Sequence, residues 1–123
     1  MRPAATDRMT PKELKDRTKL FAVDVIQLTR EPPNTLDARR VGQQLLDSST
    51  SVAANYRSAC RARSRAEFIS KLGVVEDEAD ETLFWLELMV DSKIVTLQRA
   101  EKLMKEADEL TAIFVASLKT SKH

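Results

Sequence analysis

The chain has 123 residues, which is enough for one domain with a modest core. With only 2 glycines and 4 prolines it lacks the turn residues of a many-stranded sheet, so the composition favours a few long helices. Its 20 basic and 19 acidic residues nearly cancel, which excludes a global positive field for gripping nucleic acid.

The same totals bear on the cellular compartment. A single cysteine, Cys60, rules out a disulfide within one chain and indicates a reducing environment. The first ten residues carry no apolar run of the secretory type. The longest apolar stretch, LFWLELMV, is short and contains Glu87, so we expect no membrane span. The sequence therefore predicts a cytoplasmic protein.

The first two helices can be placed from their end signals. After a leader at residues 1–9, which we expect to be disordered, Thr10-Pro11-Lys12-Glu13 forms a capping box that opens a helix. Pro32-Pro33 ends it. Its expected buried stripe is Leu14, Thr18, Phe21, Val25 and Leu28. A second helix runs from after Asn34-Thr35 to about Ala62, and its stripe is Val41, Leu45, Ser48, Val52, Tyr56 and Ala59.

Two further helices follow. Ser64-Arg65-Ala66-Glu67 is another capping box, and the helix it opens ends near residues 91–93. Its core stripe is Phe68, Leu72, Val75, Ala79, Leu83, Leu86 and Val90. The last helix runs from about Thr96 to Lys119, with Leu103, Ala107, Leu110, Phe114 and Leu118 facing inward. The expected fold is all-α, an antiparallel up-down four-helix bundle over residues 10–119, with a flexible tail at 120–123.

A run of hydroxyl residues interrupts the second helix. Ser48-Ser49-Thr50-Ser51 are mediocre helix formers, yet Ser48 lies within the buried stripe. Gln44, Ser48, Ser51 and Asn55 form a ladder on its flank. Small polar residues let another helix approach closely. That helix belongs either to the same bundle or, for part of the ladder, to another subunit, and the sequence leaves both interpretations open.

The third helix carries a second apolar face. Val74, Phe84, Trp85 and Leu88 point away from its core stripe, and Leu20, Val23 and Ile26 add to the surplus on the first helix. A monomeric bundle buries one face of each helix, so the second face needs a partner. We predict a homo-oligomer whose interface includes Val74, Phe84, Trp85, Leu88, Ser51 and Asn55. Unlike patches meeting each other favour a closed ring, and a two-fold dimer through the third helix is the alternative.

An ordered string of motifs resembles a known family. Gln44-Leu45, Ser48, Ser51-Val52 and Asn55 are followed by Arg63-Ser64, Glu67-Phe68-Ile69, Leu72 and Ala79-Asp80-Glu81-Thr82. This string is similar to the small bacterial four-helix-bundle proteins encoded in intervening sequences of large-subunit ribosomal RNA. Many members have Ile-x-Glu-Gly after the asparagine, where this chain has Tyr56-Arg57-Ser58-Ala59, so it looks like a divergent branch.

The resemblance implies a ring-like homo-oligomer, with a pentamer as the expected form, and a largely unassigned molecular activity. A relative that is similar in fold is the accessory protein of diversity-generating retroelements, a basic pentamer that binds nucleic acid. That analogy concerns the fold alone.

Catalytic and metal sites have little support. The sole histidine, His123, is the last residue, which excludes the Glu-x-x-His pairs of a di-iron bundle. Cys60 has no partner for zinc binding or nucleophilic chemistry and is expected to fill space. The acidic residues 76–81 spread around a helix, which favours a solvated or interface face over metal binding. We expect no enzyme activity, no cofactor and no metal.

Charge is unevenly distributed along the chain. Residues 32–63 contain five arginines against two aspartates, whereas residues 64–92 contain two basic and eight acidic residues. Arg39, Arg57 and Arg61 share an outward stripe, with Arg63 and Arg65 beside its end. The stripe either pairs with the acidic third helix or binds phosphates. The sequence thus predicts a non-enzymatic, homo-oligomeric scaffold or adaptor, and the competing hypothesis is an RNA- or DNA-binding accessory protein.

Overall fold

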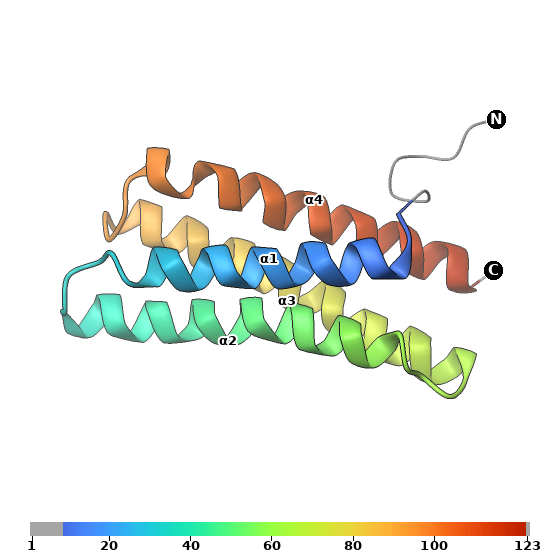
Figure 1. Cartoon of the computed structure of the whole chain (residues 1–123). Helices are drawn as coiled ribbons and strands as arrows, with labels where there is room; N and C mark the ends of the chain where they lie inside the picture. The colour runs from blue at the N-terminus through green and yellow to red at the C-terminus, as the bar shows by residue number, and fades with distance from the viewer. Residues whose placement is uncertain (1–8, 123) are drawn as a thin grey trace.

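The computed structural model describes residues 9–122, which form four helices. They are α1 (Pro11–Thr29), α2 (Leu36–Ala59), α3 (Arg65–Asp91) and α4 (Leu97–Lys122), and Figure 1 shows them packed lengthwise with alternating direction. Both α1 and α3 pack against α2 and α4, so α1 and α3 lie diagonally across the bundle. The described residues contain no strand, and the all-α, four-helix expectation is confirmed.

The helix starts follow the predicted capping residues. Thr10 Oγ1 accepts a hydrogen bond from the Glu13 amide at 3.1 Å, and Ser64 Oγ accepts one from the Glu67 amide at 3.0 Å. Thr35 caps α2 in the same way. These side chains satisfy amides that the first turn of a helix leaves unpaired.

The helix ends differ in detail from the expectation. Helix α2 stops at Ala59, before the expected Ala62. Helix α4 continues past Lys119 to Lys122, so residues 120–122 of the expected tail are helical. His123 and residues 1–8 of the expected leader lie outside the described residues.

The core matches some of the stripes predicted from the sequence and departs from others. All five residues of the α1 stripe are buried. In α3, however, Thr82 and Met89 are fully buried as well, although neither belonged to the predicted stripe. Thr82 and Met89 are seven residues apart and share one flank of α3, and Thr82 contacts Ser48 of α2. Phe68, Leu83 and Val90 of the predicted stripe are only half-buried, so the buried face of α3 is turned toward α2 relative to that stripe.

The turn between α3 and α4 has a specific conformation. The Lys93 amide donates to the Val90 carbonyl at 3.0 Å and the Ile94 amide to the Met89 carbonyl at 2.8 Å, which is the Schellman pattern. Lys93 takes the left-handed conformation that this pattern requires, with φ of 62°. None of the helices within residues 9–122 is long and apolar enough to cross a membrane.

Candidate interaction surfaces

The hydroxyl run marks a close approach between α2 and α3. The side-chain oxygens of Ser48 and Thr82 lie 3.0 Å apart, and both residues are buried. Each hydroxyl also lies near a carbonyl of its own helix, at Leu45 and Glu78. For Ser48, therefore, the interpretation as a small-residue crossing within one bundle is the one that the structure supports.

Ser51 and Asn55 lie farther out on the flank of α2. Asn55 Nδ2 donates to Ser51 Oγ at 2.7 Å and to the Ser51 carbonyl at 2.9 Å. Both residues are half-buried. Their polar atoms thus find partners locally, and their place at an interface between subunits stays a prediction.

The outer face of α3 exposes apolar side chains. Val74 is 45% exposed and Phe84 is 52% exposed. Asp80, Glu81 and Glu87 lie within one helical turn of Phe84, and all are exposed. We call Phe84 with these three carboxylates the Phe84 patch.

Trp85 is placed differently from the expectation that it points away from the core. It is half-buried and packs against the core, and its indole Nε1 is buried without a hydrogen-bond partner within residues 9–122. Trp85 follows Thr82 by one helical turn, so it lies on the side of α3 that contacts α2. Its ring meets Phe84 edge-on, with 4.9 Å between centroids. Leu88 is also half-buried.

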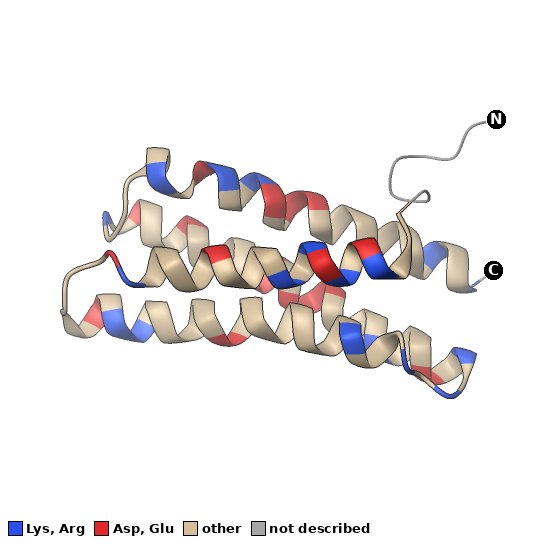
Figure 2. Cartoon of the chain, viewed as in Figure 1, with Lys and Arg blue, Asp and Glu red and all other residues tan. Residues whose placement is uncertain are grey.

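Basic residues of α1 and α2 lie at the end of the bundle where α1 begins and α2 ends, and others lie at the opposite end (Figure 2). Arg57, Arg61 and Arg63 line a hollow of about 370 Å³ together with Glu67, whose carboxylate accepts a hydrogen bond from the Arg63 backbone amide at 3.2 Å. A larger groove of about 630 Å³ lies between α1 and α2, and we call it the α1–α2 groove. Its lining consists of basic residues, one acid and small residues: Lys12, Lys15, Lys19, Arg57, Asp16, Ala22, Thr50, Ala53 and Ala54. Asp16 pairs with Lys12 at 2.9 Å.

The predicted arginine stripe divides into separate parts. Arg39 lies about five turns, or about 27 Å, from Arg57 along α2. Its guanidinium donates to Asn34 Oδ1 at 2.9 Å. Arg65 donates to the Ser121 carbonyl. The ion pairs found among residues 9–122 do not join Arg57, Arg61 or Arg63 to an acidic side chain of α3.

Sequence reasoning missed the three lysines that α1 contributes to the groove. Lys12, Lys15 and Lys19 share one side of their helix by spacing alone. Nothing in that spacing indicates that Arg57 completes the same surface, because their proximity depends on how α1 packs on α2.

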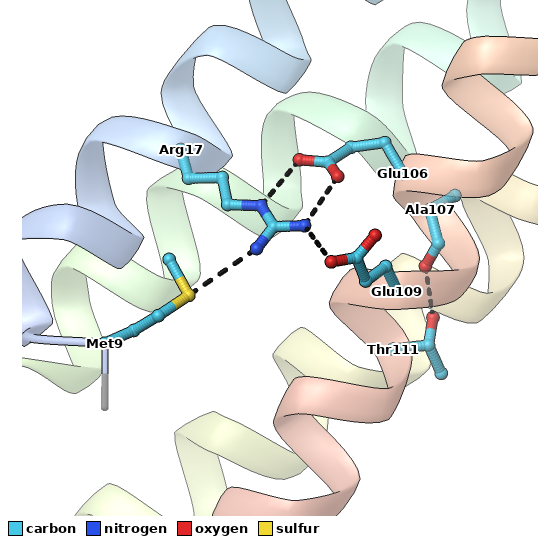
Figure 3. A network of polar contacts seen from close by, with 6 residues as sticks. All are labelled: Met9, Arg17, Glu106, Ala107, Glu109 and Thr111. Carbon is cyan, nitrogen blue, oxygen red and sulfur yellow. Dashed lines mark hydrogen bonds and ion pairs between the residues drawn. The ribbon is translucent and has the colours of Figure 1, made fainter. Parts of the chain in front are cut away.

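An ion-pair network fastens α1 to α4 on the other side of α1 (Figure 3). Arg17 donates to both carboxylate oxygens of Glu106, at 2.8 Å and 2.7 Å, and lies 3.0 Å from Glu109. One of its guanidinium nitrogens also lies 3.5 Å from the Met9 sulfur. These carboxylates, Glu106 foremost, raise the pKa of Arg17 above its usual value. The network is therefore placed to hold α1 against α4.

Two further features bear on chemistry. Within residues 9–122, no group of three or more histidine, cysteine or acidic side chains is placed to hold a metal ion. Cys60 is half-buried beside Tyr56, whose ring tilts against Phe114 at 5.7 Å. Burial, with the adjacent Cys60, raises the pKa of the Tyr56 phenol. Tyr56 belongs to the core, and Cys60 packs against it.

The fold defines a four-helix-bundle protein, and the comparisons identify its family. The model of the 23S rRNA-intervening sequence protein family matches residues 12–116, and the chain belongs to that family. This confirms the resemblance seen in the motif string.

A solved structure from Bacteroides thetaiotaomicron is similar to the chain, with a TM-score of 0.83 and 33% sequence identity. The match covers 90% of this chain and 99% of the other, which is described as a protein of unknown function from the S23 ribosomal protein family. A comparison with proteins of curated function finds no match.

Proposed function

We propose that this protein is a non-enzymatic, homo-oligomeric scaffold or adaptor that assembles as a closed ring. A pentamer is the form expected from the family resemblance, and a two-fold dimer through α3 is the alternative. The main support for the proposal is the exposure of Phe84, whose side chain is 52% exposed on a long, regular helix. Removing the rest of this ring from water would contribute about 1 kcal/mol per contact.

A second exposed apolar pair supports the ring over the dimer. Leu20 and Val23 on α1 are 60% and 40% exposed, and α1 lies diagonally across the bundle from α3. Surfaces on different sides of one molecule cannot meet through a two-fold axis alone. If a surface that includes α1 meets the α3 surface of the next copy, the contact is heterologous, and it closes into a ring or continues as a filament.

The test is the mass of the wild type and of Phe84→Asp, measured by light scattering at tens of micromolar. The wild type is expected at a multiple of 13.9 kDa and the variant at 13.9 kDa, with equal helicity by circular dichroism. Leu36→Asp is the matched control, because Leu36 is 77% exposed on α2 and lies outside the patch. A monomeric wild type would contradict the proposal. Trp85 is unsuitable for this test because it packs against the core.

The second candidate function is nucleic-acid binding. The observation that favours it is the grouping of Arg57, Arg61 and Arg63 around one hollow. If they bind phosphates, filter binding of a single-stranded RNA should weaken steeply between low and moderate salt and be lost in Arg57→Ala, Arg61→Ala. Arg39→Ala, Arg40→Ala at the far end of α2 is the control. Absence of binding at low salt would eliminate this candidate.

A further inference from the structure

The α1–α2 groove has an apolar floor and a basic rim. Its floor consists of small side chains, namely Ala22, Ala53 and Ala54 with Thr50. Because these residues are short, the helices leave open space of about 630 Å³, within the size range of about 300–1,000 Å³ typical of binding pockets. The lysine stems along its walls add apolar surface while their ammonium groups reach water.

The Phe84 patch has the opposite pattern. A protruding aromatic ring stands at its centre and three exposed carboxylates surround it. Asp80, Glu81 and Glu87 take part in none of the ion pairs found among residues 9–122. These carboxylates are therefore available to an external cationic rim.

The two surfaces are complementary in shape and in charge. The Phe84 patch presents an aromatic ring surrounded by carboxylates. The α1–α2 groove presents an apolar floor of alanines surrounded by the cationic side chains of Lys15, Lys19 and Arg57. The groove opens between α1 and α2, whereas Phe84 lies exposed on α3, which is diagonal to α1, so a chain cannot fill its own groove. We infer that the α1–α2 groove receives Phe84 from a second copy of this chain. This inference rests on the proposed homo-oligomer and names the surfaces through which its subunits meet.

Nucleic acid is the competing occupant, and the groove suits it less well. Single-stranded nucleic acid is usually held by exposed aromatic rings on which bases stack, and the groove lining contains none. One of its four cationic side chains, Lys12, is already paired with Asp16. The apolar floor would also remain unused by a phosphate backbone.

Charge reversal tests the inference. Lys15→Glu, Lys19→Glu reverses the rim of the groove, and Asp80→Lys, Glu81→Lys reverses the patch. Each pair alone should raise the apparent dissociation constant of the oligomer by about tenfold or more, measured by sedimentation velocity across a concentration series. A chain carrying all four changes should recover the wild-type mass, which also shows that the substitutions permit folding. Arg30→Glu, Arg40→Glu at the opposite end of the bundle should leave the mass unchanged.

The outcomes separate the inference from the proposed function. A monomeric wild type would contradict both. If the wild type is oligomeric but its mass is unaffected by either reversal, or is not recovered in the fourfold variant, the assembly stands and the groove is not its contact. Binding of a single-stranded oligouridine that is abolished by Lys15→Glu, Lys19→Glu, with no change in oligomeric mass, would assign the groove to nucleic acid instead.

Discussion

Ser48 shows how one small side chain sets the distance between two helices. It lies at the α2–α3 crossing with its oxygen 3.0 Å from that of Thr82. We predict that Ser48→Leu lowers the free energy of unfolding by about 1–3 kcal/mol, because the larger side chain must force the helices apart. Ser51→Leu on the half-buried flank is the control and should cost less. If urea denaturation gives the same loss of unfolding free energy for Ser48→Leu and Ser51→Leu, the helices do not approach especially closely at position 48.

Lys93 carries a backbone cost that a glycine would remove. Its φ of 62° is the left-handed conformation that the Schellman turn demands and that a Cβ atom disfavours. Lys93→Gly should therefore raise the free energy of unfolding by about 0.5–1 kcal/mol, net of the added freedom of the unfolded chain. Thermal denaturation measures it, with Ser92→Gly, whose φ of −88° is ordinary, as a destabilised comparison.

At the scale of elements, Arg17 holds α1 against α4. Its guanidinium bonds Glu106 in a two-pronged manner, and both side chains are only 25% exposed. Arg17→Ala should lower the free energy of unfolding by about 1 kcal/mol, since partial exposure weakens a charged hydrogen bond. Lys12→Ala breaks a surface pair whose side chains are 82% and 68% exposed, and it should change stability little. If both variants lose a similar free energy of unfolding, the Arg17–Glu106 ion pair does not stabilise the bundle more than a surface pair does.

The pair between Glu31 and Arg99 joins the end of α1 to the start of α4 and should respond to acid. The hydrogen bond from Arg99 lowers the pKa of Glu31 below its usual value of 4.5. A lowered folded-state pKa means that this contribution is present above pH 4.5 and is lost as the pH falls through the folded value. The stability difference between wild type and Glu31→Gln should therefore shrink on acidification. If the stability difference between the wild type and Glu31→Gln stays constant from pH 6 to pH 3, the Glu31–Arg99 pair does not make this acid-sensitive contribution.

The sequence predicts the helices well because the capping residues that start each helix lie directly beside it in the chain. Thr10 and Ser64 each cap the helix that begins one residue later, as the capping boxes indicate. The partner of each face is a different matter, since periodicity identifies an apolar side but not which helix covers it. Trp85 illustrates this limit: its position on α3 suggested exposure, but the neighbouring packing covers much of it. The groove likewise depends on packing between α1 and α2.

At the scale of the whole molecule, the two proposed contact surfaces lie at different heights. Thr82 is level with Ser48, so Phe84 lies near the level of Leu46, whereas the α2 wall of the groove runs from Thr50 to Arg57. At 1.5 Å per residue this offset is about 6–16 Å along the bundle axis. Two copies joined through these surfaces cannot stand side by side in register. Each bundle must tilt toward its neighbour, which would give the ring a skewed wall.

The position of Trp85 allows its intrinsic fluorescence to report on assembly. It is the sole tryptophan of the chain, half-buried and in edge contact with Phe84. Its emission should shift to shorter wavelength as protein concentration rises, because a second copy covering Phe84 would also dry the indole beside it. The shift should vanish in Phe84→Asp, while denaturant should move the emission of both proteins to longer wavelength. A single fluorophore that needs no label would thus distinguish the assembled, the dissociated and the unfolded chain.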